Sequence, residues 1–253
     1  MWPYPTVLAH RGGGILAPEN TIAGIQCGLE RGFHAIEFDV MLSSDGVPLL
    51  MHDERRGRTV AGSGAISEFA ADELLQLDAG AWFGPQFKGV RIPAFAEVIA
   101  FCKQHRIWMN VEIKPVPGFE RETGEVAAKM VQDMFAPELA AQTGAANLPL
   151  FSSFSFDALQ AAQRYAPDIP RGFLMDRIPS DWKAKLEELG AMALHTNHKH
   201  LSPELAHAIK AAGYGLLCYT VNDEARAREI LGWGVDAFCT DRIDLIGPRF
   251  PHS

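Results

Sequence analysis

The chain has 253 residues, 47% hydrophobic and 21% charged, a balance typical of a soluble globular protein with one sizeable core. Its formal net charge of -8 argues against nucleic acid or an anionic membrane surface as the main partner, because both favour basic patches. No apolar run approaches the roughly 18–20 residues of a membrane span, and Met1-Trp2-Pro3-Tyr4-Pro5 lacks the regions of a signal peptide. We therefore expect a cytoplasmic protein without stable membrane insertion.

From Thr6 onward, short apolar runs alternate with longer amphipathic stretches, the pattern of βα units around a parallel sheet. Eight runs predict strands: Thr6–His10, Phe33–Val40, Trp108–Lys114, Leu148–Ser152, Ile169–Met175, Met192–Thr196, Gly215–Thr220 and Val235–Thr240. The expected helices are Thr21–Arg31, Ala94–His105, Glu122–Phe135, Phe156–Tyr165, Trp182–Leu189, Pro203–Ala212 and Glu224–Leu231. Eight units in about 250 residues favour a single α/β domain over residues 1–253, a (β/α)8 TIM barrel rather than an open doubly wound sheet.

One segment breaks this alternation. Val47–Met51 predicts an extra strand after the turn Ser44-Asp45-Gly46, and the stretch at about 53–92 follows it. This stretch is much longer than a βα loop of roughly two to six residues. We expect a small insertion after the second strand, standing over the C-terminal rim of the barrel, where Trp82 and Phe83 are candidate walls of a substrate pocket.

Three acidic side chains lie near the ends of predicted strands, where TIM barrels place their active sites. Alternation along the second strand puts Glu37 and Asp39 on one face, and Glu112 lies near the end of the third. Buried acids side by side need a compensating cation. Carboxylate oxygens are the ligands that Mg²⁺ and Ca²⁺ prefer, so we predict that these three residues bind one divalent cation.

Basic and titratable side chains occupy the same rims. Arg11 follows the first predicted strand and Lys114 ends the third, and both suit phosphate oxygens. With three carboxylates and a divalent cation, these charges balance once a singly charged phosphodiester is bound, which favours a diester over a monoester. His10 and His52 are the candidates for the general acid and the general base. The residues leave open which histidine takes which role, and whether water or a neighbouring hydroxyl of the substrate attacks.

Eight short motifs occur in a familiar order: His10-Arg11-Gly12, Pro18-Glu19-Asn20-Thr21, Ile36-Glu37-Phe38-Asp39-Val40, Asp45-Gly46-Val47-Pro48, His52-Asp53, Leu77-Asp78-Ala79-Gly80, Ile92-Pro93 and Glu112-Ile113-Lys114. They resemble the motifs of the glycerophosphodiester phosphodiesterases. The likeness continues in Tyr219-Thr220-Val221-Asn222, Val235-Asp236 and Thr240-Asp241. Tyr219 stands where Trp is usual in this family, which bears on the pocket wall and the preferred head group.

The resemblance implies metal-dependent hydrolysis of glycerophosphodiesters to sn-glycerol 3-phosphate and an alcohol, on a TIM barrel with a small insertion. It assigns the acid and base roles to His10 and His52, the metal to Glu37, Asp39 and Glu112, and the phosphate contacts to Arg11 and Lys114.

Further residues are candidates for supporting roles. Asn20 or Thr21 is placed to cap the first helix, so Glu19 either supports the site or complements the helix dipole. His195, at the end of the sixth predicted strand, and Tyr219 are candidates for the substrate pocket.

Two other functions share parts of this pattern. A phospholipase D-type barrel that cleaves lipid head groups has similar H-R-G and E-x-D motifs, but the acidic balance and the missing secretion signal disfavour it. A catalytically silent phosphate-binding barrel would have lost a metal ligand or a histidine, and none of these five residues is missing. We expect an enzyme; the alcohol, the native metal and the oligomeric state are not indicated.

Overall fold

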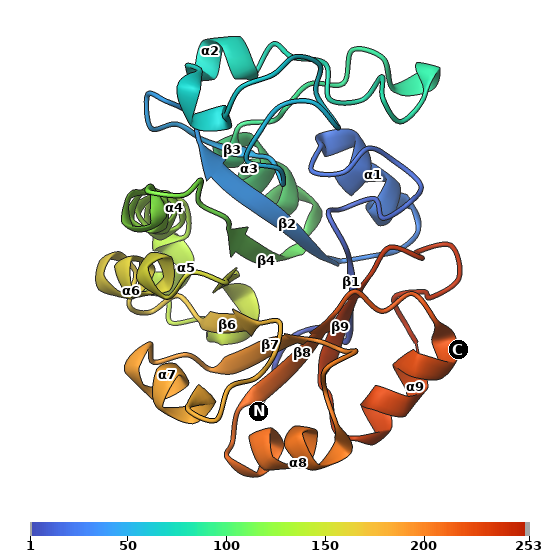
Figure 1. The fold of residues 1–253 in the computed structure, drawn as a ribbon, viewed down its shortest axis with the longest axis vertical. Coiled ribbons are helices and arrows are strands. Elements are labelled where there is room, and N and C mark those ends of the chain that lie inside the picture. The colour runs from blue at the N-terminus through green and yellow to red at the C-terminus, as the bar shows by residue number, and fades with distance from the viewer. Residues whose placement is uncertain (1, 251–253) are drawn as a thin grey trace.

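The computed structural model describes residues 2–250 and shows a closed barrel of eight parallel strands surrounded by helices (Figure 1). The barrel strands are β1 (Val7–Ala9), β2 (Ala35–Leu42), β4 (Trp108–Ile113), β5 (Leu150–Ser153), β6 (Arg171–Met175), β7 (Ala193–Asn197), β8 (Gly215–Tyr219) and β9 (Ala237–Thr240). The pairing of Ala9 with Ile36 joins β1 to β2 and closes the barrel. The predicted (β/α)8 TIM barrel is confirmed.

Helices follow the strands in the chain and cover the outside of the barrel. The longer ones are α1 (Ile22–Glu30), α3 (Phe95–His105), α4 (Glu120–Met134), α6 (Phe156–Tyr165), α7 (Trp182–Glu188), α8 (Pro203–Ala211) and α9 (Glu224–Gly232). Four of them, α1, α6, α8 and α9, are capped by a polar side chain that accepts a hydrogen bond from a backbone amide of the first turn. These capping residues are Thr21, Ser155, Ser202 and Asp223. Between α4 and β5 lie the short α5 (Ala136–Ala140) and η3 (Ala145–Asn147). Within residues 2–250, no helix has the length and apolar character needed to span a bilayer.

Alternation along each strand separates an outer core from an inner one. In β2, Ile36, Phe38 and Val40 belong to the large core between barrel and helices. The barrel interior contains a smaller apolar cluster of Leu8, Ala35, Leu217, Ala237 and Cys239. Since Glu37 and Asp39 alternate with the outward residues of β2, their side chains point into the barrel. The strand pattern therefore brings charged groups to its interior.

The segment after β2 forms a small insertion at the edge of the barrel, at the top of Figure 1. The strand β3 (Pro48–Leu50) pairs antiparallel with β2. Residues 53–92 then contain only η1 (Ile66–Glu68), α2 (Ala71–Leu74) and η2 (Pro85–Phe87). Their apolar side chains share a separate core with the ends of β2 and β3, made of Met41, Leu49, Met51, Val60, Ile66, Leu74, Ala79, Ile92 and Val116. This core fixes the insertion beside the C-terminal end of β2.

Candidate active site

The three predicted metal ligands converge inside the C-terminal end of the barrel. Asp39 and Glu112 are direct neighbours on the paired strands β2 and β4, and Glu37 lies two residues earlier on β2. One carboxylate oxygen from each lies within 4.8 Å of the other two. Glu37 and Asp39 are buried, and Oε1 of Glu112 is buried without a hydrogen-bond partner. The strand register therefore assembles one compact cluster of oxygen atoms.

Crowding of these acids shifts their protonation in opposite directions. Burial, followed by the charge of Asp39, raises the pKa of Glu37 to about 7 and raises the pKa of Glu112 well above its usual value. Burial also works against ionisation of Asp39, but the charges of Lys114 and Arg11 outweigh it and lower the pKa of Asp39. Glu37 thus keeps its proton toward neutral pH, the pKa of Glu112 is shifted in the same direction, and a nearby cation would favour the ionised forms of both acids.

Two basic side chains flank the acid cluster. Nζ of Lys114 lies 3.5 Å from Oδ1 of Asp39 and 3.9 Å from Oε1 of Glu112. Nε of Arg11 lies 3.7 Å from Oδ2 of Asp39, and this buried nitrogen makes no hydrogen bond. The backbone of Arg11 has a φ of 51°, in the left-handed region, and its amide donates to Oε2 of Glu37 at 3.1 Å. Both cations are therefore held beside the acids with hydrogen-bonding capacity left for a ligand.

The ring of His10 is held by the far end of the chain. Its Nδ1 lies 2.6 Å from Oδ1 of Asp241, which follows β9, and its Nε2 lies 3.7 Å from Oε2 of Glu37. Asn222 fixes this carboxylate, because its side-chain amide donates to Oδ2 of Asp241 at 2.8 Å. Burial opposes the charged imidazole, but the hydrogen bond to Asp241 and the charge of Glu37 outweigh it and raise the pKa of His10.

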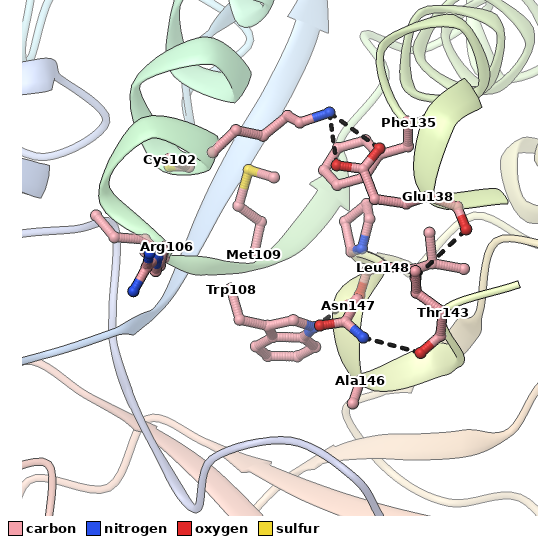
Figure 2. A pocket seen from close by; sticks show the side chains of 13 residues that line it. Cys102, Arg106, Trp108, Met109, Phe135, Glu138, Thr143, Ala146, Asn147 and Leu148 are labelled. Atoms are coloured by element: carbon pink, nitrogen blue, oxygen red, sulfur yellow. Dashed lines mark hydrogen bonds and ion pairs between the residues drawn. The ribbon is translucent and has the colours of Figure 1, made fainter. Parts of the chain in front are cut away.

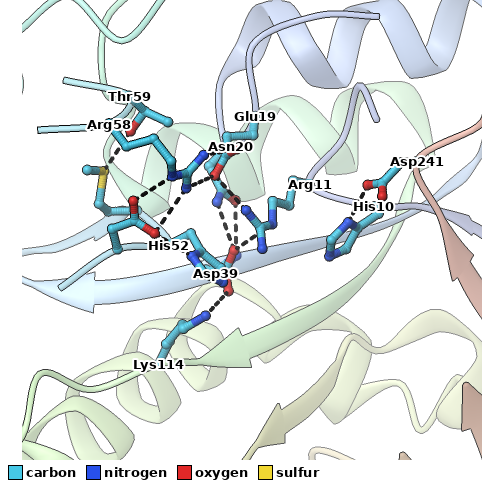
Figure 3. A network of polar contacts seen from close by, with 12 residues as sticks. His10, Arg11, Glu19, Asn20, Asp39, His52, Arg58, Thr59, Lys114 and Asp241 are labelled. Atoms are coloured by element: carbon cyan, nitrogen blue, oxygen red, sulfur yellow. Dashed lines mark hydrogen bonds and ion pairs between the residues drawn. The ribbon is translucent and has the colours of Figure 1, made fainter. Parts of the chain in front are cut away.

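His52 follows β3 and lies on the opposite side of Asp39 and Arg11 from His10 (Figure 3). Its Nδ1 lies 2.7 Å from Oδ1 of Asp53, so this ring also has a carboxylate partner. Burial lowers the pKa of His52, against the attraction of Asp39. The two histidines are therefore bound alike but differ in basicity.

The carboxylate partner of His52 belongs to a larger network, also drawn in Figure 3. Arg58 of the insertion donates to both oxygens of Asp53, from Nε at 2.7 Å and from Nη2 at 3.0 Å. It also donates to both oxygens of Glu19, from Nη1 at 2.7 Å and from Nη2 at 2.8 Å. Glu19 in turn accepts from Nη1 of Arg11 at 2.7 Å. The structure thus places the predicted supporting residue Glu19 between two arginines.

A cavity of about 230 Å³ opens among these groups. Beside the seven predicted catalytic, metal and phosphate residues, its lining includes Asn110, Phe154, Leu174, His195, Leu217, Tyr219, Thr220 and Cys239. The rings of Phe154 and Tyr219 meet edge to face with centroids 5.8 Å apart and form an apolar wall. Trp82 and Phe83, expected as pocket walls, are not among the lining residues. They pack against each other within the insertion, and the indole of Trp82 donates to the carbonyl of Ala79.

Several polar atoms in and beneath this cavity have no hydrogen-bond partner in the described chain. His195 is fully buried, neither of its ring nitrogens is paired, and burial lowers its pKa to about 3. Gly172 on the neighbouring strand makes room for the ring, because a Cβ there would lie 2.4 Å from Nε2 of His195. Oδ1 of Asn110 and the hydroxyl of Tyr219 are also buried and unpaired. A bound ligand therefore meets neutral hydrogen-bonding groups as well as charges.

Asn20 and Arg58 gain roles that their sequence context does not reveal. Thr21 caps α1, whereas Asn20, with a φ of 55°, donates to Oδ2 of Asp39 at 2.8 Å and accepts from its backbone amide at 3.0 Å. Its place in the P-E-N-T motif marks Asn20 without naming its partner. Arg58 is one of several arginines at the start of the insertion, and nothing in the sequence distinguishes it.

A cavity of about 400 Å³ lies at the opposite end of β4, around Trp108 and Met109 (Figure 2). Several of its polar groups bond to one another. Nζ of Lys103 lies 2.9 Å from Oε1 of Glu138, and the indole of Trp108 donates to the carbonyl of Leu148 at 2.9 Å. The residues that line it include one carboxylate and no histidine. This cavity therefore lacks the histidines and the three clustered carboxylates that line the cavity at the C-terminal end of the barrel.

A sequence profile described as the glycerophosphoryl diester phosphodiesterase family matches residues 10–245. The chain belongs to this family. A glycerophosphodiester phosphodiesterase of Caldanaerobacter subterraneus subsp. tengcongensis is 32% identical over 240 residues, which are 93% of this chain and 93% of the relative. The predicted family is thus confirmed, and with it an enzyme of the phosphodiesterase class.

Solved structures agree with the assignment of the chain to this family. A phosphodiesterase of Oleispira antarctica, in complex with the product sn-glycerol-3-phosphate, is 38% identical and has a TM-score of 0.86, covering 94% of this chain and 93% of its own. A glycerophosphodiester phosphodiesterase of Agrobacterium tumefaciens is 29% identical with a TM-score of 0.78, covering 95% of this chain and 98% of its own. The likeness spans the whole barrel.

Proposed function

We propose that this phosphodiesterase hydrolyses glycerophosphodiesters to sn-glycerol 3-phosphate and an alcohol, with one divalent cation and with His10 and His52 as the acid and base pair. The observation that carries the proposal is the single cavity in which three carboxylates, two cations and two histidines converge. The product bound in the Oleispira antarctica structure supports this class of substrate.

Glu37, Asp39 and Glu112 are the residues that would hold the cation. Their donor set consists of oxygen atoms alone, which suits Mg²⁺ or Ca²⁺. Two observations support the fit: Oε1 of Glu112 is unpaired, and the pKa values of Glu37 and Glu112 are raised. The surrounding protein groups therefore do not fully stabilise the negative charges of these two acids, and a bound cation would. When bound, a divalent cation polarises a phosphoryl oxygen and offsets the charge of these acids.

Arg11 and Lys114 would orient the phosphate. Arg11 lies beside Oδ2 of Asp39 and Lys114 lies beside Oδ1. A phosphate next to the acid cluster can therefore meet a cation on each side. Arg11 offers a planar fork and Lys114 a point charge. Together with a divalent cation they exceed the charge of the three carboxylates by one, which a phosphodiester monoanion neutralises and a monoester dianion does not.

His10 and His52 would move the protons. In each ring the carboxylate partner engages Nδ1 and leaves Nε2 for the substrate, which fixes the orientation of the ring. Because the rings lie on opposite sides of Arg11 and Asp39, one can take a proton from the attacking water or neighbouring substrate hydroxyl while the other protonates the leaving alkoxide. Each role contributes roughly 10²–10⁴ in rate.

The apolar wall of Phe154 and Tyr219 would contact the part of the substrate that carries no charge. Phe154 is 48% exposed, which places its ring toward the mouth of the cavity, whereas the Tyr219 hydroxyl is buried. We expect this wall to influence the choice of alcohol. A reducing compartment such as the cytoplasm suits the protein, because its four cysteines are free thiols.

The test is release of sn-glycerol 3-phosphate from glycerophosphodiesters with different alcohols, measured with EDTA and after adding back Mg²⁺ or Ca²⁺. We expect release that EDTA abolishes and a cation restores; full turnover in chelator would contradict the metal. Glycerol 3-phosphate itself should yield no inorganic phosphate. A phospholipase D-type activity would instead cleave intact lipid head groups faster, and a silent barrel would bind a diester without releasing product.

The histidine assignment is tested by His52→Ala beside His105→Ala, which removes a half-buried histidine at the C-terminal end of α3 that does not line the cavity. The first substitution should lower turnover by roughly 10²–10⁴-fold with little change in melting temperature. The second should leave turnover near that of the wild type. Normal turnover in His52→Ala would remove this residue from the mechanism.

A further inference from the structure

Arg58 is the residue of the insertion that touches the groups supporting both sides of the site. Its guanidinium donates four hydrogen bonds, two to Asp53 and two to Glu19. Such forked contacts to planar carboxylates fix both distance and orientation, which a single charged contact does not. Arg58 itself lines no part of the catalytic cavity, so it acts through its two partners.

The first partner leads to the proton-transfer side of the site. Asp53 uses Oδ1 both for Nδ1 of His52, at 2.7 Å, and for Nη2 of Arg58, at 3.0 Å. Asp53 directly follows His52 in the chain, and its side chain could orient the carboxylate toward that ring in several ways. The second contact, from Nε of Arg58 to Oδ2 at 2.7 Å, selects one of them.

The second partner leads to the phosphate side. Oε1 of Glu19 accepts from Nη2 of Arg58 at 2.8 Å and from Nη1 of Arg11 at 2.7 Å. Two arginines therefore share one carboxylate. Without Arg58, Glu19 would be free to turn about its side-chain torsions, and Arg11 would lose the fixed partner that holds its guanidinium beside Asp39.

We propose that Arg58 is a positioning residue that sets the orientations of both His52 and Arg11, through Asp53 and Glu19 respectively. The insertion then supplies one positioning residue to the site and is not only a cover for one edge of the barrel. This inference rests on the proposed function for its kinetic test, but the contacts that carry it do not depend on the identity of the alcohol.

Arg56 offers a matched control two residues away. Its guanidinium donates twice to the carbonyl of Ser63, at 3.1 and 2.8 Å, and its Cζ lies 3.6 Å from the centroid of the Phe69 ring. It also donates to Oε1 of Glu73 at 3.3 Å. These contacts stabilise the insertion without reaching the site, so Arg56→Gln reports what loosening the insertion does by itself.

The kinetic test compares Arg58→Gln, Arg58→Lys and Arg56→Gln with the wild type on a glycerophosphodiester. Arg58→Gln should lower kcat about 10–100-fold and also raise KM, as for other residues that orient catalytic groups. Lysine has three donors on a single nitrogen and cannot reproduce four forked hydrogen bonds, so Arg58→Lys should resemble Arg58→Gln. Arg56→Gln should keep both constants near the wild type while lowering the melting temperature.

Two double variants separate the branches. In an Asp53→Asn background, adding Arg58→Gln should have little further effect on kcat, and in a Glu19→Gln background it should have little further effect on KM. Full additivity in both backgrounds, or kinetic constants of Arg58→Gln that match those of Arg56→Gln, would overturn the proposal.

A measurement without substrate keeps this inference separate from the proposed function. Proton NMR of the wild type should show the Nδ1 proton of His52, assigned by its absence in His52→Gln, in slow exchange and far downfield. Arg58→Gln should lose or broaden this signal, whereas Arg56→Gln should retain it. A wild type that releases no sn-glycerol 3-phosphate would refute the proposed function, but an unchanged signal in Arg58→Gln would refute the positioning role.

Discussion

Nδ1 of His10 lies 2.6 Å from Oδ1 of Asp241, although 231 positions separate the two residues in the chain. Asn222 determines which atoms Asp241 presents. Its Oδ1 accepts from the backbone amide of Asp241 at 2.8 Å and from the hydroxyl of Thr240 at 3.2 Å, so its amide nitrogen must face Oδ2 of Asp241. His10 therefore donates from Nδ1 to a carboxylate and keeps Nε2 for the cavity.

Asp241→Asn should reverse this arrangement. Because Asn222 still donates, the new carbonyl oxygen would face Asn222 and the new amide nitrogen would face His10. The ring would then have to accept at Nδ1 and carry its proton on Nε2, the opposite tautomer. We expect kcat to fall by roughly 10²–10⁴-fold, the range for losing a general acid or base, with a melting temperature close to that of the wild type.

The control for this variant is Asp244→Asn, which removes a nearby carboxylate that pairs with Arg242 at 2.9 Å outside the cavity. Steady-state kinetics on a glycerophosphodiester should show wild-type turnover for Asp244→Asn. Equal turnover in the two variants would mean that Asp241 does not control the tautomer of His10.

Whether the role of a residue could be predicted from the sequence depended on whether its partners are related to it by a regular element. Glu37 and Asp39 could be placed from the sequence because strand alternation defines their common face and a carboxylate is itself a metal ligand. Arg58 could not, since its partner Glu19 lies 39 positions away and residues 53–92 contain no strand whose register relates the two. Trp82 and Phe83 illustrate the same difficulty, because their aromatic character fits a pocket wall and the packing of an insertion equally well.

The raised pKa values in the acid cluster predict a proton-linked response to metal. Burial, then the charge of Asp39, raises the pKa of Glu37 from 4.5 to about 7, and Glu112 is shifted in the same direction. The native state thus binds these protons more strongly than the unfolded state. The contribution of Glu37 to stability is fully present below about pH 4.5 and is lost as the pH rises through about 7, and the contribution of Glu112 is likewise lost as the pH rises.

In EDTA, the melting temperature should therefore decline across this pH range by more in the wild type than in Glu112→Gln. Mg²⁺ should raise the melting temperature of the wild type, and calorimetry near pH 6 in buffers of different ionisation enthalpy should detect proton release on binding. Glu125→Gln, at a surface pair with Lys129, should respond to Mg²⁺ as the wild type does. An equal response from Glu112→Gln would remove Glu112 from the metal site.

His195 predicts a second and opposite pH dependence. Burial lowers its pKa from 6.5 to about 3, so the native state keeps the ring neutral while the unfolded state binds a proton. The resulting stability is complete above about pH 6.5 and is lost as the pH falls toward 3, at about 1 kcal/mol per pH unit. His195→Leu carries no such group. As the pH falls, the free energy of unfolding of the wild type should therefore decrease by more than that of His195→Leu.

Urea unfolding of the wild type and His195→Leu at pH 7 and pH 5 measures this difference. His207→Leu, on the exposed face of α8, is the control and should follow the wild type more closely. If the His195→Leu and wild-type curves keep a constant separation between the two pH values, the ring is not held neutral by burial.

Arg171 joins two helix ends at the start of β6 and is 6% exposed. Its guanidinium donates to the carbonyls of Leu189 at 3.0 Å, Ile169 at 2.8 Å, Pro167 at 3.1 Å, Ala166 at 3.4 Å and Gly190 at 3.4 Å. Ala166 and Leu189 are the C-terminal caps of α6 and α7. The positive charge therefore lies where the dipoles of both helices are negative, and it satisfies carbonyls that helices leave without partners.

Arg171→Met should lower the free energy of unfolding by roughly 3 kcal/mol, because several buried carbonyls lose their donor at once. Arg121→Met, which removes an arginine that is 77% exposed, should change it by no more than about 0.5 kcal/mol. Urea unfolding followed by tryptophan fluorescence gives both values. Since Arg171 lies at the N-terminal end of its strand, away from the catalytic cavity, turnover per folded molecule should stay at the wild-type level. Equal stabilities of the two variants would show that Arg171 does not hold these helix ends.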